Sequence, residues 1–69
     1  MNQQNSAYEY LTPAEAARIL RRSPRTLARM RAEGRGPKYH REGGLVLYWR
    51  DDLNDWFLQR RVTPPRSDA

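Results

Sequence analysis

Apolar residues recur at helical spacing in three stretches of the chain, and each stretch predicts a short helix with one buried face. The three predicted helices cover residues 13–20, 24–33 and 50–58. Within each, the apolar positions lie three or four residues apart and charged side chains occupy other positions. The residues predicted to face the core are Ala16, Ala17, Leu20, Leu27, Met30, Leu53, Trp56 and Phe57.

Residues that favour helix ends bound the first two helices. A threonine–proline pair at 12–13 opens the first helix, and Glu15 stands where a capping box requires it. A serine–proline pair at 23–24 opens the second helix, and Gly34 ends it. Only about three residues separate the two helices, which favours a helix-turn-helix over an antiparallel helical hairpin.

Two short segments, residues 38–41 and 45–49, flank a glycine turn and predict a β-hairpin. Strand alternation permits either face of the second segment to be buried. Because an isolated hairpin is marginally stable, it must pack on the helices. The predicted fold is therefore mainly α with a small β-hairpin, in the order helix, turn, helix, hairpin, helix: a winged helix-turn-helix.

The predicted domain spans residues 8–61, between a polar arm at 1–7 and a proline-rich tail at 62–69 that are both expected to be disordered. A chain of 69 residues makes one domain with a thin core, and the lack of cysteine excludes disulfides and thiolate metal sites. No apolar run is long enough to span a bilayer, and the polar N-terminus does not resemble a signal peptide. We expect a cytoplasmic protein.

Positive charge is concentrated in the middle of the chain. The net charge is +5, but nine basic residues and one acidic residue fall between Arg18 and Arg41. This segment therefore carries +8 and the remaining residues carry −3. Such asymmetry predicts a surface that faces a polyanion, the alternative being a solvated basic face without a partner.

The second predicted helix carries candidate DNA-reading side chains. Arg25 and Arg29 lie one turn apart on its exposed face, and an arginine can donate two hydrogen bonds to O6 and N7 of guanine. Thr26 can donate to a phosphate or touch a thymine methyl. The alternative for either arginine is a solvated charge or, for Arg29, an ion pair with Glu33.

Other polar residues are candidates for anchoring the duplex. The candidate phosphate-binding residues at the end of the first helix and in the turn are Arg18, Arg21, Arg22 and Ser23. The candidates on the hairpin, which would serve as the wing, are Lys38, His40 and Arg41. His40 is the only histidine, which excludes a histidine metal cluster, and Tyr39 is expected in the core.

The sequence argues against catalysis. Asp51, Asp52 and Asp55 could form a metal-binding group, but capping and solubility account for acidic residues at the start and on the exposed side of a helix. There is no phosphate-binding glycine loop, and one histidine without cysteine gives no nucleophile–base pair. We expect a non-enzymatic protein without cofactor, metal or small-molecule ligand.

Four blocks, spaced in order, complete the pattern. They are Tyr10-Leu11-Thr12-Pro13-x-Glu15-Ala16-Ala17-x-x-Leu20, Ser23-Pro24-Arg25-Thr26-Leu27, Gly34-x-x-Pro37-x-Tyr39 and Tyr48-x-Arg50-x-Asp52-Leu53-x-x-Trp56. Together they span residues 10–58 and resemble the MerR-like excisionase group, which includes phage excisionases and AlpA-type regulators. The resemblance implies a bacterial or phage protein whose partner is double-stranded DNA.

The resemblance also implies a particular role, that of an excisionase or recombination directionality factor. Such a protein binds and bends attachment-site DNA and helps an integrase to excise a mobile element, so an integrase and further copies of the chain are expected partners. The alternatives are a small AlpA-like transcriptional regulator and, from a different class, a protein-interaction module.

Finally, the resemblance bears on which face of the 45–49 strand is buried. Relatives carry an apolar and an aromatic residue at the equivalents of Val46 and Tyr48, which implies that these two side chains lie inside. Leu45, Leu47 and Trp49 would then be partly exposed. Leu47 and Trp49 either cover the edge of the thin core or form an interface for a recombinase or a second copy.

Overall fold

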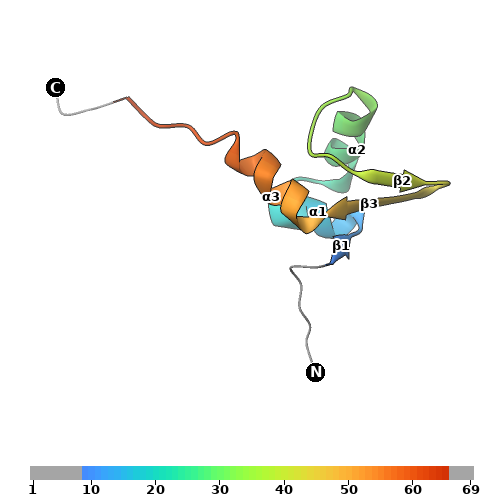
Figure 1. Cartoon of the computed structure of the whole chain (residues 1–69). Helices are drawn as coiled ribbons and strands as arrows, with labels where there is room; N and C mark the ends of the chain where they lie inside the picture. The colour runs from blue at the N-terminus through green and yellow to red at the C-terminus, as the bar shows by residue number, and fades with distance from the viewer. Residues whose placement is uncertain (1–8, 66–69) are drawn as a thin grey trace.

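The computed structural model describes residues 9–65, in which three helices and three strands follow one another as β1-α1-α2-β2-β3-α3 (Figure 1). The helices are α1 (Pro13–Leu20), α2 (Pro24–Ala32) and α3 (Arg50–Leu58), and the strands are β1 (Tyr10–Leu11), β2 (His40–Glu42) and β3 (Leu45–Trp49). The predicted winged helix-turn-helix is confirmed. The predicted arm at 1–7 and the end of the predicted tail, 66–69, lie outside the described residues.

The first two helices begin at the predicted caps. Thr12 Oγ1 accepts from the Glu15 N–H at 3.1 Å, and Glu15 Oε1 accepts from the Thr12 N–H at 2.9 Å, which completes the capping box. Trp49 occupies the N-cap position of α3 without a side-chain hydrogen bond. The expectation that acidic side chains cap α3 is therefore wrong; Asp51 and Asp52 lie in its first turn, where they favour the helix dipole.

After α2 the chain turns back over Met30. Gly34 adopts φ +75°, and the Arg35 N–H donates to the Met30 carbonyl at 2.9 Å, so α2 ends in a Schellman motif. Gly36 adopts φ +95°, and a Cβ atom there would lie 3.2 Å from the Met30 Cβ. Glycine at position 36 thus allows both the backbone conformation and the close approach that bring the chain back to the hairpin.

The strands form an antiparallel sheet in the order β1-β3-β2. β1 was not predicted, because a strand of only two residues is too short to show an alternating pattern. Gly43 begins the two-residue hairpin turn with φ +62°, a conformation that favours glycine. The hairpin tip projects away from the helices and forms the wing (Figure 1).

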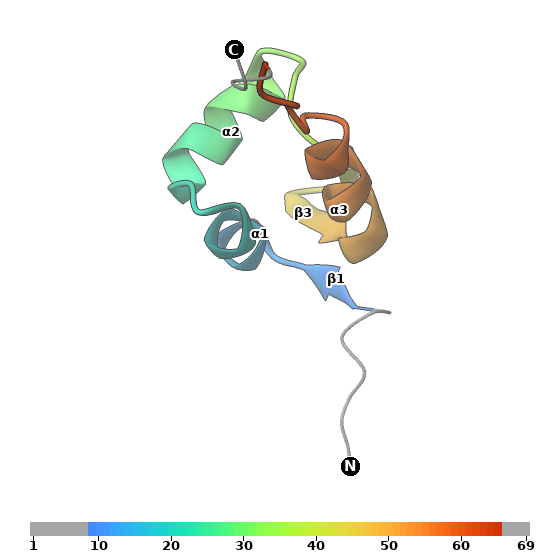
Figure 2. The same cartoon turned by 90° about the vertical axis from the view of Figure 1, so that its left-hand side faces the viewer.

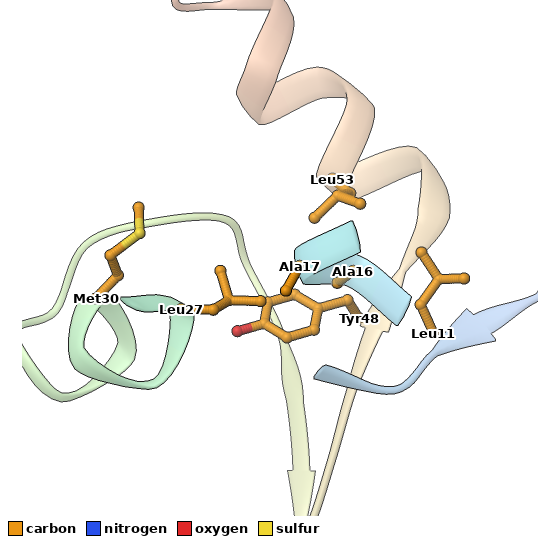
Figure 3. Packing of buried hydrophobic residues seen from close by; sticks show 7 residues of the cluster. All are labelled: Leu11, Ala16, Ala17, Leu27, Met30, Tyr48 and Leu53. Carbon is orange, nitrogen blue, oxygen red and sulfur yellow. The ribbon is translucent and has the colours of Figure 1, made fainter. Parts of the chain in front are cut away.

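Tyr48 lies at the centre of the hydrophobic core (Figure 3). Its ring is fully buried beside Leu27, and its hydroxyl accepts a hydrogen bond from Arg31 Nη1 at 2.9 Å. Val46, on the same face of β3, is half-buried against the core, so the predicted buried face is confirmed. The residues of the buried hydrophobic cluster are Leu11, Ala16, Ala17, Leu27, Met30, Tyr48 and Leu53.

The prediction for α3 is right for two of its three apolar residues. Leu53 is buried, and Trp56 is half-buried against the core. Phe57 is 59% exposed, so its assignment to the core is wrong. Successive helical residues are rotated by about 100°, and this rotation places Phe57 beside Ile19 at a hollow between α1 and α3. No further element of the described chain covers Phe57 there.

We expect the Tyr48→Phe substitution to lower the free energy of unfolding by about 0.5–1.5 kcal/mol, because it removes one hydrogen bond while keeping the buried ring. Tyr10→Phe is the matched control, because the Tyr10 side chain is about half exposed and the Tyr10 hydroxyl has no hydrogen-bond partner within residues 9–65. Urea denaturation of both variants measures the difference. Equal stability of the two variants would show that the Arg31–Tyr48 hydrogen bond contributes nothing.

Candidate nucleic-acid interface

Arg25 and Arg29 project from the exposed side of α2, opposite the buried Leu27 and Met30. Neither guanidinium group makes a hydrogen bond or ion pair with another described residue. The alternative of an Arg29–Glu33 ion pair is wrong, because Glu33 Oε1 instead accepts from Arg35 Nε at 2.7 Å. Both predicted reading arginines therefore have all their donors available to a ligand.

Ser23 and Thr26 are bonded to each other at the start of α2. Ser23 Oγ accepts from the Thr26 N–H and donates to Thr26 Oγ1, each at 3.0 Å. Thr26 is half-buried and lies about 100° around the helix from Arg25, so it flanks the exposed face. The Thr26 hydroxyl hydrogen remains available for a phosphate, whereas the Ser23 hydroxyl is used in capping.

Arg31 is a structurally important residue to which the sequence pattern assigned no role. It is half-buried on the flank of α2 that faces the hairpin, and its Cζ lies 5.8 Å from the Tyr39 ring centre and 5.9 Å from that of Tyr48. Arg41 Cζ lies 5.8 Å from the same Tyr39 ring. These cation–π contacts, with the Arg31–Tyr48 hydrogen bond, fix the wing relative to α2.

The turn between α1 and α2 contains a strained backbone position. Arg21 adopts φ +58°, a left-handed conformation that non-glycine residues rarely adopt. The Arg22 N–H donates to the Ala17 carbonyl at 2.9 Å and the Arg21 N–H to that of Arg18 at 3.1 Å, so α1 also ends in a Schellman motif. Arg18, Arg21 and Arg22 are all exposed, as phosphate contacts require.

The three predicted wing residues do not form one cluster. His40 and Arg41 are adjacent in β2, so their side chains lie on opposite faces of the sheet. His40 makes an edge contact with Tyr10, with 5.2 Å between ring centres, on the outer face. Lys38 lies at the base of the wing, beside a hollow that is also lined by Asp52 and Asp55.

The outer face of the sheet carries a second group of predicted site residues. Leu47 and Trp49 are half-buried there, outside the core, and the Trp49 ring centre lies 4.8 Å from that of Tyr10. Leu45, on the same face, is 54% exposed. The structure thus brings Leu47 and Trp49 together with Tyr10, whose strand was not predicted.

Two features of residues 9–65 bear on other functions. No group of three or more His, Cys, Asp or Glu side chains in this part of the chain could hold a metal ion. Of the helices that the structure describes, none is sufficiently long and apolar to cross a membrane.

A short, well-capped helix with free arginines, held beside a β-hairpin wing, defines the chain as a DNA-binding helix-turn-helix protein. The comparison with known families gives the same class. Residues 10–61 match the model of a helix-turn-helix domain, and the chain belongs to this family, which is found in excisionase- and AlpA-like proteins. A search of curated proteins gives no match.

We expect Arg21→Gly to raise the free energy of unfolding by about 0.5–1 kcal/mol, because glycine relieves the left-handed strain at some cost in chain entropy. Arg22→Gly is the matched control: it removes the same charge one residue away, where φ is not positive. It should lower stability. Thermal unfolding of the two variants tests this, and equal destabilisation by both would show that Arg21 is not strained.

Proposed function

We propose that this protein is an excisionase, a recombination directionality factor that binds attachment-site DNA in a sequence-specific manner. In this proposal it bends the DNA and helps an integrase to excise a mobile element. The observation that supports it is the pair of free arginines, Arg25 and Arg29, on the exposed side of a capped helix in a family found in excisionase-like proteins. In this role the protein binds and bends the DNA, and the integrase carries out the chemical steps.

The proposed contacts divide into base reading and anchoring. With α2 in the major groove, Arg25 and Arg29 would donate to guanine, and Thr26 would contact the flanking phosphate or a thymine methyl. Arg18, Arg21 and Arg22 would fix the position of the domain on the phosphates, whereas the Ser23 hydroxyl stays with Thr26 in the cap of α2. Lys38, His40 and Arg41 would contact the neighbouring backbone or minor groove from the wing.

If Arg25 and Arg29 read bases, we expect Arg25→Ala and Arg29→Ala each to weaken binding to attachment-site DNA by about 1–3 kcal/mol. Binding to random duplex should change much less. Arg18→Ala is the matched control, since a phosphate contact contributes equally to all sequences. Fluorescence anisotropy on both duplexes measures the ratio of the affinity for attachment-site DNA to the affinity for random DNA. A similar loss on specific and random DNA for Arg29→Ala would remove its base-reading role.

The excisionase role is tested by reconstituted recombination. We expect excision by the integrase of the element that encodes this protein to rise on adding the protein, and to fall again with Arg25→Ala. A circular-permutation gel assay on the same site should show bending. If the protein does not change the rate of excision but changes transcription from a nearby promoter, the chain is a small transcriptional regulator of the same fold.

The apolar outer face of the sheet favours a second candidate function, that of a protein-interaction module. Tyr10, Leu45, Leu47 and Trp49 gather there without a covering element in the described chain. We propose that this face contacts the recombinase or a second copy during excision. A Leu47→Thr variant that binds DNA normally but no longer supports excision would assign the face to a protein partner; unchanged excision would exclude that role.

A further inference from the structure

A groove of about 730 Å³ lies between the α1–α2 turn, α2 and α3. Four arginines line it, Arg21, Arg22, Arg35 and Arg60, and no acidic side chain is among its lining residues. We call it the arginine groove. Figure 2 shows its setting, with α2 and α3 on either side of α1. Because like charges gathered around one hollow repel each other, an anion in the groove would be stabilised.

Arg60 follows the end of α3 and is held at this groove by Trp56 of that helix. Its Cζ lies 4.1 Å from the centre of the Trp56 ring, and its Nη1 donates to the Trp56 carbonyl oxygen at 3.1 Å. A stacked guanidinium loses less side-chain freedom on binding an anion than a mobile one, and its remaining donors suit the two oxygens of a phosphate. Arg35 uses only Nε for Glu33, so its terminal nitrogens remain available.

The arginine groove also lies directly beside the proposed reading face. Thr26 and Met30, on one flank of α2, line the arginine groove. Arg31 lies on the opposite flank of the helix, towards the wing. The major groove of B-DNA is about 12 Å wide, and a helix with its side chains is about 10–12 Å across. A helix seated there has a sugar–phosphate strand along each flank.

We propose that one sugar–phosphate strand of the bound duplex runs along the arginine groove and is held by Arg60 and Arg35 as well as by Arg21 and Arg22. The other strand then lies on the wing side. This inference rests on the proposed function, because it assumes that α2 occupies the major groove. It adds Arg60, a residue in the turn after α3 and outside both the two helices α1 and α2 and the wing, to the DNA-binding surface.

The test compares Arg60→Gln with Arg61→Gln. Both substitutions remove one positive charge just after α3, but Arg61 does not line the groove. We expect Arg60→Gln to weaken binding by about fivefold to tenfold at 0.1 M salt, equally on attachment-site and random duplexes, and to reduce the salt slope of log K by about 0.9. Arg61→Gln should leave the slope close to that of the wild type.

Hydroxyl-radical footprinting supplies a readout that a merely structural role of Arg60 would not change. Arg60→Gln should lose protection on one strand only, while protection on the wing side persists. Arg60→Lys, which keeps the charge, should restore both slope and footprint. Equal slopes for Arg60→Gln and Arg61→Gln, with an unchanged footprint, would overturn the proposal and leave the groove to another ligand, such as an acidic protein segment.

These outcomes are distinguishable from failure of the proposed function. If α2 does not read DNA, Arg25→Ala leaves the ratio of specific to random binding unchanged, whatever Arg60→Gln does. If α2 reads DNA but the arginine groove does not hold a strand, Arg25→Ala alone alters binding. Circular dichroism of each variant at the assay temperature verifies that it is folded.

Discussion

The fold depends on the buried side chain of Tyr48, which joins the wing to both helices of the helix-turn-helix. Its ring fills the space beside Leu27 and the small alanines of α1, and its hydroxyl accepts from Arg31. In a domain of this size a thin core gives few other places to connect three helices and a sheet. The position of the wing relative to α2 is therefore set by one aromatic residue and the arginine bonded to it.

This arrangement divides the basic residues of the central segment into different roles. Arg31 donates to the buried Tyr48, and Arg35 is paired with Glu33. Arg25 and Arg29 remain free on the exposed face of α2. The basic residues of this segment are therefore not equally available for contacts with a ligand. The rigid connection between α2 and the hairpin would present reading and anchoring residues to DNA in a fixed geometry, which lowers the entropy lost on binding.

Residues with strong local signals were predicted well, and those that depend on distant neighbours were not. The caps at Thr12 and Ser23 followed from the sequence, because these signals lie within one helical turn, and the bounds of α3 followed from the spacing of its apolar residues. Phe57 shared the spacing of core residues but lies uncovered, since α3 packs along Leu53 and Trp56. For the candidate interface, the sequence predicted that Arg25 and Arg29 are exposed on α2, and the structure agrees. It did not predict that the three wing residues, Lys38, His40 and Arg41, lie on different surfaces.

The sequence alone determined the helices, the hairpin turn, the buried face of α2 and the concentration of positive charge, since each depends on neighbouring residues or on residue counts. The resemblance to a known family settled the buried face of β3. Only the tertiary structure decided which arginine turns inward, because Arg31 meets a tyrosine 17 residues away. It likewise brought Arg60 beside the α1–α2 turn, a proximity created by packing between helices that no spacing along the chain encodes.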